Sequence, residues 1–378
     1  MWYILTRDSY PASGTRTPTT SVSSTSTSPI ATATSSSPTA AYNGTSLSTV
    51  YYQVDGTPTT GNYVLFYQHS NGNIEKLVYN QSTWFPSALV TQDAILGTGL
   101  SSVWLGGSPI SIHLYYIDKN GYLQELRGSD GSNEWVNGTL GQAGFQAAMP
   151  SPHSHLDSIF TGTCKNSVSG WVNYEAQNGV LSQAIWNQDD DSWTSGTTFP
   201  DVRPGSDFVT ELEDGPDGPW RLFTSTAKES IQEYVCTDCC QNPSSNTYEP
   251  GKFFSPYCLI TLLTPAGLSS SAVMASYSGF GGANVGLPRL LYYQTPNNAI
   301  QELNSTGDGV YGNETFTIST NTVTQAMAGS RFAFVAGFQG KTQQPHLFYQ
   351  SNSTNIEVTS RLVTDTYWTP GVALPIGI

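Results

Sequence analysis

One pattern of apolar and polar residues recurs six times along this chain of 378 residues. Each copy begins with a run of aromatic and aliphatic residues, passes through a polar turn to a second run centred on an aliphatic residue, and ends at a Trp or Tyr. Another small-residue or apolar run precedes each copy, so a unit holds about four short strands with Gly, Asn, Asp and Ser at the turns. The aromatic runs begin at Val64, His113, Trp171, Arg221, Leu290 and His346.

The spacing of the copies indicates a single repetitive architecture. Units of about fifty residues with four strands, repeated radially, are typical of a propeller, in which each sheet covers its neighbour's apolar face. A β-sandwich would not repeat one signature six times. The sequence therefore predicts an all-β fold, a six-bladed β-propeller of four-stranded antiparallel blades. Matching positions of the second runs are 49, 58, 50, 69 and 56 residues apart, and they are Lys76, Glu125, Gln183, Glu233, Glu302 and Val358.

The first forty residues differ from the rest in composition. Residues 13–39 are about two-thirds Ser and Thr and contain three prolines, and a segment of this composition cannot bury a core. We therefore expect residues 1–42 to form a disordered Ser/Thr/Pro-rich stalk and residues 43–378 to form the propeller domain.

The balance of charge narrows the choice of partners and compartment. The formal net charge is −14 and no basic run compensates it, which argues against nucleic acid or an anionic membrane surface as a partner. A neutral polar ligand suits the chain better. With the stalk, six glycosylation sequons favour an extracellular or cell-surface location, and we expect that a signal or membrane anchor preceded Met1. The sequons lie at Asn43, Asn80, Asn137, Asn304, Asn313 and Asn352.

Four of the five cysteines lie in one short region, and the fifth stands apart. The C-x-x-C pair that begins at Cys236 is a feature of structural zinc sites, but no second pair and no nearby His completes four ligands. In an oxidising compartment, local disulfides are favoured over a metal, and their pairing is left open. We expect no metal and no cofactor. The five residues are Cys164, Cys236, Cys239, Cys240 and Cys258.

The chain lacks the residue patterns that catalysis needs. Its densest acidic cluster, Asp189 to Asp191, lies between Trp186 and Trp193, where a hairpin turn belongs, and we interpret it as a solvated turn. The motifs of serine hydrolases, of phosphate-binding loops and of zinc peptidases are absent from the sequence. The sequence therefore predicts that the protein is not an enzyme.

The fourth copy carries a pair of residues suited to binding. Arg221 opens the aromatic run and Glu233 follows twelve residues later, after the turn, so two neighbouring antiparallel strands would hold the side chains together. A guanidinium and a carboxylate offer donors and acceptors to adjacent sugar hydroxyls. A Trp or Tyr of the following strand offers a face on which sugar C–H groups pack. Such a site recognises a sugar without activating it.

Three of the copies resemble the repeats of the fungal fucose-specific lectins, and the resemblance extends over about residues 45–378. It implies a six-bladed propeller that binds fucose between blades. It also implies sites built from an Arg on the aromatic strand, a Glu twelve residues on and an aromatic residue from the strand after it. The matching phrases are Arg221-Leu222-Phe223 with Ile231-Gln232-Glu233, Leu291-Tyr292-Tyr293-Gln294 with Ile300-Gln301-Glu302, and Leu114-Tyr115-Tyr116 with Leu123-Gln124-Glu125.

The copies keep the residues of this pattern to different degrees. The fourth keeps both the Arg and the Glu. The second has His in place of Arg and the fifth has Leu, but both keep the Glu and an aromatic residue. The first, third and sixth copies have lost the polar pair. The candidate sugar-binding residues are therefore Arg221, Glu233, Tyr248, His113, Glu125, Trp135, Glu302 and Tyr311.

These observations predict a lectin-like protein with one to three surviving inter-blade sites for fucosylated or related glycans. Single sites of modest affinity would gain avidity from clustering, either in oligomers or as many copies on a wall or membrane. The alternative is a degenerate propeller without sugar binding, acting as an extracellular protein-interaction or cell-wall structural module. The loss of the polar pair in three copies favours that alternative.

Overall fold

Six antiparallel sheets make up the part of the chain that the computed structural model describes. Most of the expected stalk lies outside the described residues, and Ala41, near its predicted end, is buried and forms a β-bridge with His69. No helix in the described ranges is long and apolar enough to cross a membrane. These ranges are 40–52, 62–80, 83–105, 111–129, 133–148, 155–160, 168–199, 202, 204–212, 220–225, 231–236, 249–250, 259–260, 274–277, 290–306, 315–339, 342–362 and 365–376.

Each sheet consists of four strands that follow one another in the chain and pair in that order, and β5 and β18 add a further pairing to their sheets. Blades one to three contain β1 (Leu47–Tyr52), β2 (Asn62–Gln68), β3 (Ile74–Asn80), β4 (Thr83–Trp84), β5 (Ala88–Thr91), β6 (Leu100–Leu105), β7 (Ser111–Ile117), β8 (Leu123–Ser129), β9 (Trp135–Asn137), β10 (Leu156–Phe160), β11 (Val168–Glu175), β12 (Leu181–Asn187) and β13 (Ser192–Phe199), with the short helix α1 (Leu140–Ala143) after β9.

Blades four to six follow the same order. They contain β14 (Phe208–Leu212), β15 (Trp220–Ser225), β16 (Ile231–Cys236), β17 (Glu249–Pro250), β18 (Leu259–Ile260), β19 (Met274–Tyr277), β20 (Leu290–Gln294), β21 (Ala299–Thr306), β22 (Thr315–Gln325), β23 (Phe332–Gln339), β24 (Thr342–Gln350), β25 (Ile356–Ser360) and β26 (Val372–Ala373).

The aromatic runs of the sequence form the second strand of every blade, and the second runs form the third strand. A second strand has a partner on each edge and a sheet on each face, so most of its described residues are buried, and all seven residues of β2 are. The turn that follows uses a left-handed backbone position, which favours Gly or Asn. This position is Gly72 (φ +91°), Gly121 (φ +84°), Gly179 (φ +76°) and Asn298 (φ +66°) in four of the blades.

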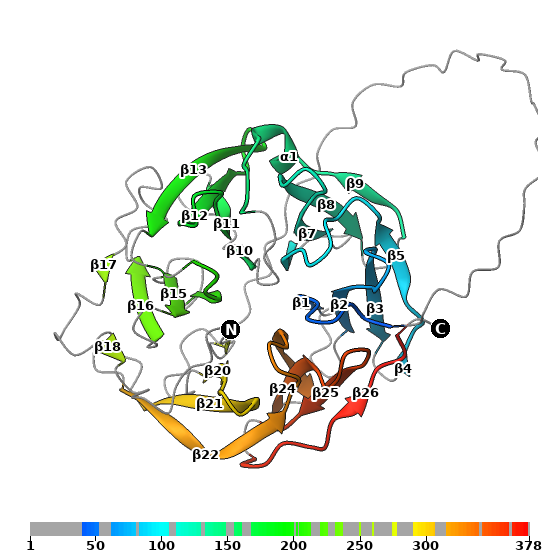
Figure 1. The fold of residues 1–378 in the computed structure, drawn as a ribbon, viewed down its shortest axis with the longest axis vertical. Helices are drawn as coiled ribbons and strands as arrows, with labels where there is room; N and C mark the ends of the chain where they lie inside the picture. The colour runs from blue at the N-terminus through cyan, green and yellow to red at the C-terminus, as the bar shows by residue number, and fades with distance from the viewer. Residues whose placement is uncertain are drawn as a thin grey trace, which may run out of the picture. The chain divides into compact units, whose positions relative to one another are not determined.

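The first strands of the blades contact one another in chain order, from β1 through β6, β10, β14 and β19 to β23, and β23 contacts β1. The described domain is thus a closed ring of blades with its first strands innermost (Figure 1). The start of the domain also joins the last blade. Gly44 N donates to Gln350 Oε1 at 2.9 Å, Gln350 Nε2 donates to the Tyr42 carbonyl at 3.0 Å, and Ala41 N donates to the Thr354 carbonyl at 3.2 Å. The structure confirms the predicted six-bladed propeller.

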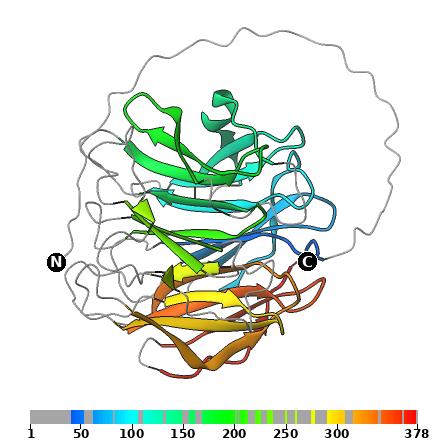
Figure 2. The ribbon, with the colours of Figure 1, turned by 60° about the vertical axis from the view of Figure 1, so that its left-hand side comes forward.

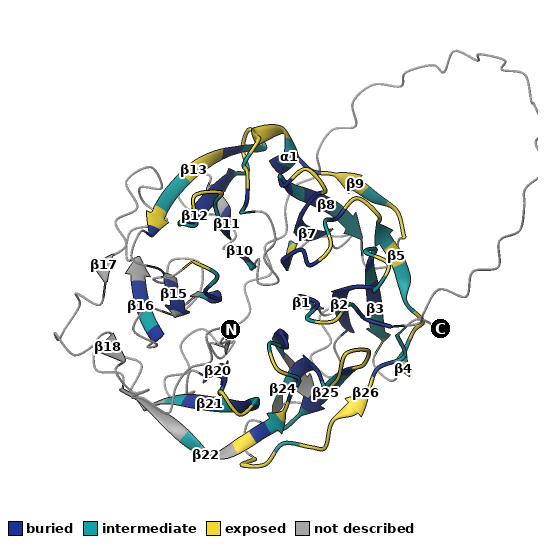
Figure 3. Cartoon of the chain, viewed as in Figure 1, coloured by how far each residue is buried: buried dark blue, intermediate teal, exposed yellow. Residues whose placement is uncertain are grey.

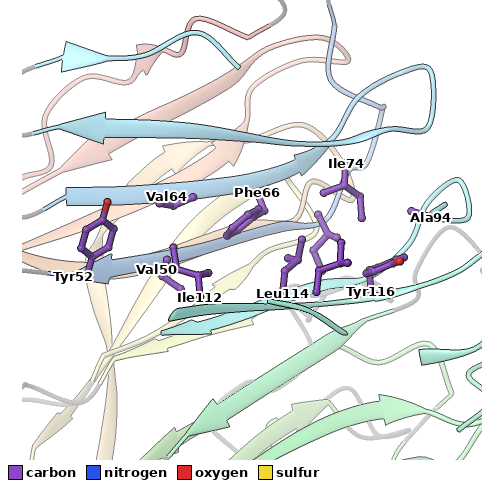
Figure 4. Packing of buried hydrophobic residues seen from close by; sticks show 11 residues of the cluster. Val50, Tyr52, Val64, Phe66, Ile74, Ala94, Ile112, Leu114 and Tyr116 are labelled. Carbon is purple, nitrogen blue, oxygen red and sulfur yellow. The ribbon is translucent and has the colours of Figure 1, made fainter. Parts of the chain in front are cut away.

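The apolar core lies between the sheets, in the seams where one blade faces the next. In the first seam, Val64 and Phe66 of β2 pack against Ile112 and Leu114 of β7 (Figure 4). Buried residues concentrate on the inner strands and exposed ones on the rim (Figure 3). Figure 2 shows the same face-to-face packing for the yellow and orange-to-red sheets of blades five and six.

A Trp near the outer strand of four blades packs edge-to-face on an aromatic ring of the preceding blade. The interplanar angles lie between 79° and 87°, which is the arrangement that ring quadrupoles favour. The ring centroids are 5.6–5.9 Å apart in Trp84–Phe348, Trp135–Phe66, Trp193–Tyr115 and Trp368–Tyr292.

The last copy departs from the expected strand pattern. The sequence places its outer strand at Trp368, whereas Trp368 lies in an irregular segment and the strand is β26. The ring nevertheless reaches Tyr292 of blade five. The contact between blades, rather than the pairing within the sheet, therefore fixes the position of this Trp.

We expect the Trp193→Ala variant to lose about 3–5 kcal/mol of unfolding free energy, because it removes a buried ring from the seam between blades two and three. The exposed neighbour in the same strand supplies the control, and Thr194→Ala should stay within about 0.5 kcal/mol of the parent. Urea unfolding followed by circular dichroism measures both. Equal effects of the two substitutions would contradict the role given to the ring.

Candidate functional site

The strand register places two side chains of every blade in the seam toward the next blade. The residue at the position of Glu233 pairs directly with a residue of the second strand, and the residue at the position of Arg221 lies two places earlier on that strand and on the same face. Every blade therefore presents a side chain from its second strand and one from its third strand to the seam. The direct pairs are Phe66 with Lys76, Tyr115 with Glu125, Asn173 with Gln183, Phe223 with Glu233, Tyr292 with Glu302 and Phe348 with Val358.

The fourth blade brings Arg221 and Glu233 together, as the twelve-residue spacing predicts. Arg221 in β15 and Glu233 in β16 are both buried, and Arg221 Nη1 donates to Glu233 Oε1. Phe223, on the same face, packs with Leu291 and Tyr293 of β20. The pair therefore faces the seam between blades four and five, where a guanidinium and a carboxylate together carry no net charge.

The second blade brings His113 and Glu125 together, but protein groups surround the carboxylate. His113 Nδ1 lies 2.7 Å from Glu125 Oε1, and Arg127, two residues along β8 on the same face, donates from Nε to that oxygen at 2.8 Å. Glu125 Oε2 accepts the backbone N–H groups of Thr139 at 3.0 Å and Leu140 at 3.3 Å. Both carboxylate oxygens are thus engaged by the protein itself.

Arg127 continues from Glu125 to the next blade, where it meets the acidic turn. Its Nη1 donates to Asp191 Oδ2 at 2.9 Å and its Nη2 to Asp191 Oδ1 at 2.6 Å. Trp186 Nε1 donates to the same Oδ1 at 2.9 Å, and the guanidinium lies 5.7 Å from the Trp186 ring centroid. The cluster lies in a turn, as the sequence predicts, with Asp189 and Asp190 exposed. The Asp191 side chain is 41% exposed and also binds across the seam, a contact that the sequence did not indicate. We call Glu125, Arg127 and Asp191 the blade 2–3 clamp.

The clamp changes the proton affinity of its carboxylates. Burial alone raises the pKa of Glu125, but the hydrogen bonds from His113 and Arg127 outweigh it and bring the pKa below its usual value. The hydrogen bonds from Arg127 lower the pKa of Asp191 as well. Both carboxylates are therefore held in the charged form.

Trp135 does not lie with His113 and Glu125, contrary to the sequence-based grouping. It pairs with Gly128 on the other face of β8, toward blade one, where it meets Phe66. A Cβ added at Gly128 would lie 2.8 Å from the Trp135 ring, so the glycine makes room for it. In the second and fifth blades, the aromatic residue beside the polar group comes from the following blade, as Trp186 and Trp368 do.

The fifth blade also pairs its Glu with a guanidinium, but the Arg comes from blade six. Tyr292 Oη donates to Glu302 Oε2 at 2.8 Å, and Arg361 Nη2 donates to the same oxygen at 2.8 Å. Arg361 lies 5.4 Å from the Trp368 ring centroid. Leu290, at the position of Arg221, is buried in the apolar core of this seam. We call Glu302 and Arg361 the blade 5–6 clamp.

The remaining seams hold other side chains at the two positions. His346 Nε2 lies 3.0 Å from Tyr63 Oη, and burial lowers the pKa of His346 to about 4. Trp171 is buried, next to a Gln183–Asn173 hydrogen bond of 3.0 Å. The first seam holds Val64 and Lys76. None of these three carries the guanidinium–carboxylate pair.

Sequence reasoning missed Arg127, Asp191 and Arg361. Glu125 and Arg127 are two residues apart in one strand, so strand alternation is a signal that could have placed them on one face. Arg361 is 59 residues from Glu302 in the chain, and the packing of blade six on blade five brings them together. A search by local spacing cannot find such a pair.

Several sequence-based assignments concern residues that the structure does not describe. In the described ranges, no group of three or more His, Cys, Asp and Glu side chains is arranged to hold a metal ion. Cys236 ends β16. The assignments outside the described ranges are those for Tyr248, Tyr311, Cys164, Cys239, Cys240 and Cys258.

Comparison with known proteins places the chain in a family. The family described as fungal fucose-specific lectin matches residues 42–260. No curated protein sequence matches. Among solved structures, the six-bladed Aleuria aurantia lectin is 17% identical with a TM-score of 0.65, covering 90% of this chain and 99% of that chain.

Two further structures have the same fold. AofleA from Arthrobotrys oligospora is 16% identical with a TM-score of 0.65, covering 90% of this chain and 89% of that chain. The BP39L lectin from Burkholderia pseudomallei is 13% identical with a TM-score of 0.58, covering 88% and 85%. At such identities the structures show a shared fold, whereas the family match spans more than half of the sequence. The chain therefore belongs to the fungal fucose-specific lectin family.

Proposed function

We propose that the protein binds a fucosylated glycan in the seam between blades four and five, through Arg221 and Glu233. The observation that carries the proposal is the buried contact between these two side chains, in the one copy of six that keeps both residues of the family pattern. A mutant form of the Aleuria aurantia lectin forms complexes with α-methyl-L-fucoside and with Fucα1-6GlcNAc. Those ligands indicate the sugar to test first.

The chemistry of the pair suits a neutral sugar. A guanidinium has five N–H donors suited to a ring oxygen or a hydroxyl, and a carboxylate is suited to accept from a neighbouring hydroxyl. Hydrogen bonds to charged groups are roughly twice as strong as neutral ones, and burial strengthens them further. Neither group is a nucleophile placed beside a base, so the proposed activity is binding without turnover.

The two clamps have a different proposed role. Both oxygens of Glu125 already accept hydrogen bonds, and Glu302 Oε2 accepts two. We infer that these seams use their carboxylates to hold adjacent blades together. The protein would then have one principal sugar site, at the lower end of the one to three expected. Avidity would require clustering, in oligomers or as many copies at an extracellular surface.

The two clamps also support the alternative function, because their carboxylates are engaged by the protein itself. A propeller whose carboxylates are engaged internally can act as an extracellular structural or protein-interaction module that binds no sugar. The two functions differ in one measurable property, which is the retention of fucose by the fourth seam.

We expect Arg221→Ala and Glu233→Gln each to weaken binding of α-methyl-L-fucoside by at least about tenfold, because each removes one member of a buried charged pair. Isothermal titration calorimetry measures the affinity and should give about one site per chain for the parent protein. Lys119→Ala, at an exposed turn position, serves as the control and should bind like the parent. Unchanged affinity in both seam variants would eliminate this site, and no binding by the parent would favour the structural module.

For the blade 2–3 clamp, we expect Glu125→Gln to lower the unfolding free energy at pH 7 by about 1–3 kcal/mol, because the buried carboxylate's charged hydrogen bonds are weakened while Arg127 keeps Asp191. Fucoside affinity should not change. Because the folded-state pKa of Glu125 lies below its usual value of 4.5, this stabilisation is present above about pH 4.5 and is lost as the pH falls through the lowered pKa.

Urea unfolding between pH 7 and pH 3 tests this clamp, with Asp93→Asn, at an exposed carboxylate, as the control. The gap between the parent and Glu125→Gln should narrow toward pH 3. A gap that is independent of pH, or a loss of fucoside binding in the folded Glu125→Gln variant, would contradict the assignment.

A further inference from the structure

We propose that acid strengthens the joint between blades three and four, because Glu175 and Asp157 take up protons as the pH falls and then hold blade four more firmly. This inference concerns the fold and does not depend on the Arg221–Glu233 site. It rests on the contacts that cross this joint, on the residue that other blades use at the position of Glu175, and on the chemistry of a carboxylate in the place of an amide.

The last residue of the second strand ties a blade to the segment that leads into the next blade. In three blades this residue is Gln, and it pairs with the first residue of the third strand. Its amide donates to a backbone carbonyl of that segment at 2.8–3.0 Å, and in two of the three blades its oxygen also accepts a backbone N–H there. We call these residues the linking glutamines, and they are Gln68, bonded to Ile95 and Gly97, Gln294, bonded to Met327, and Gln350, bonded to Tyr42 and Gly44.

The third blade has a carboxylate at the same position. Glu175 pairs with Leu181, the first residue of its third strand. Its Oε2 accepts the N–H of Gly205 at 2.8 Å, as Gln68 Oε1 accepts that of Gly97 at 2.7 Å. An ionised carboxylate cannot make the other bond of a linking glutamine, because it has no proton to donate. Protonation supplies an O–H, so the neutral acid can both accept and donate as the amide does.

The second oxygen of Glu175 lies beside a turn that offers an acceptor in blade one. There, Gln68 Nε2 donates to the carbonyl of Gly72 at 2.9 Å. The equivalent residue in blade three is Gly179, which has the same left-handed backbone. Glu175 Oε1 lies 3.7 Å from the position that a Cβ would take on Gly179. A proton on Oε1 is therefore placed near the turn that accepts the amide proton in blade one.

A second carboxylate crosses the same joint between the first strands. Asp157 in β10 accepts the N–H of Thr210 in β14 at 2.6 Å, and the Thr210 hydroxyl bonds to it as well. Asn173 Nδ2 donates to that hydroxyl oxygen at 2.7 Å, which leaves the hydroxyl proton for Asp157. Carboxylates of blade three thus bind backbone N–H groups of blade four at two places.

Other charged groups near this joint are His155, Asp207 and Arg331. His155 and Asp207 immediately precede β10 and β14, and His155 Nδ1 lies 3.1 Å from Asp207 Oδ1. Asp207 also acts electrostatically on Arg331, which precedes β23. His155 favours the charged form of Asp157, so a protonated His155 opposes the proposed effect. Variants that change only Asp157 or Glu175 keep this opposing group constant.

The proton affinities of the two carboxylates set the direction of the effect. Burial raises the pKa of Asp157 to about 6, and it raises the pKa of Glu175 above its usual value of 4.5. The folded chain therefore binds these protons more readily than the unfolded chain. The resulting stabilisation is fully present below about pH 4, the range of the unfolded groups, and is lost as the pH rises through the raised pKa values. The blade 2–3 clamp has the opposite sign.

Hydrogen exchange of the full chain, followed by mass spectrometry and corrected for the intrinsic pH dependence of exchange, tests the joint. Between pH 7 and pH 5, we expect the protection of amides in β10 and β14 to increase about tenfold, as proton uptake by one group with a pKa of about 6 predicts. The contact between β1 and β6, next to a linking glutamine, is the internal reference and should change less.

Substitutions assign the effect to the two carboxylates. Glu175→Gln installs a linking glutamine, so it should raise protection of the joint at pH 7 and reduce the gain on acidification. Asp157→Asn should also reduce the gain, and the double variant should remove it. Asp93→Asn, at an exposed carboxylate between β5 and β6, is the control and should keep the parent's gain. In the reverse exchange, Gln68→Glu should make the contact between β1 and β6 gain protection as the pH falls.

Either of two results would overturn the inference. One is a parent chain in which β10 and β14 gain no more protection between pH 7 and pH 5 than β1 and β6 do. The other is a pair of folded variants, Glu175→Gln and Asp157→Asn, that both keep the full gain of the parent.

Discussion

The fold depends on the contact between one blade's aromatic strand and the blade that follows it. Each sheet is too thin to bury its own apolar faces, so stability comes from the seams, where four Trp side chains pack edge-to-face on rings of the preceding blade. Because β-strand side chains alternate, the residues that do not build this contact are forced to the opposite seam. A substitution at a buried position of an inner strand therefore acts on a pair of blades.

Because the blades share one strand register, equivalent residues occupy the same position in each seam and can be compared directly. A carboxylate there pairs with Arg221 in one seam and belongs to a clamp in two others, while Lys76 gives the first seam the opposite charge. Burial makes each choice consequential, because a charge removed from water needs a partner close at hand. In this member of the fucose-specific lectin family, the repeats thus differ in the chemistry of one seam position while they share one strand register.

The sequence was sufficient to predict whatever depends on local order. The repeated strand pairs gave the propeller, and the twelve-residue spacing placed Arg221 next to Glu233, since a hairpin brings such positions to one face. It was insufficient where one blade meets another. Trp135 was assigned to its own repeat although it packs backward, and Arg361 reaches Glu302 across 59 residues of chain. These contacts depend on the packing of one blade on its neighbour, which no single repeat encodes.

The joint between the beginning of the domain and its last blade has a consequence for biosynthesis. Tyr42 and Gly44 bond to Gln350, more than three hundred residues later in the chain. During synthesis, the earlier blades must therefore wait with two uncovered apolar faces until the final blade has left the ribosome. Such long-range closure slows folding and exposes aggregation-prone surface in the meantime. A chain truncated within blade six would be left with those faces permanently open, a target for chaperones and proteases.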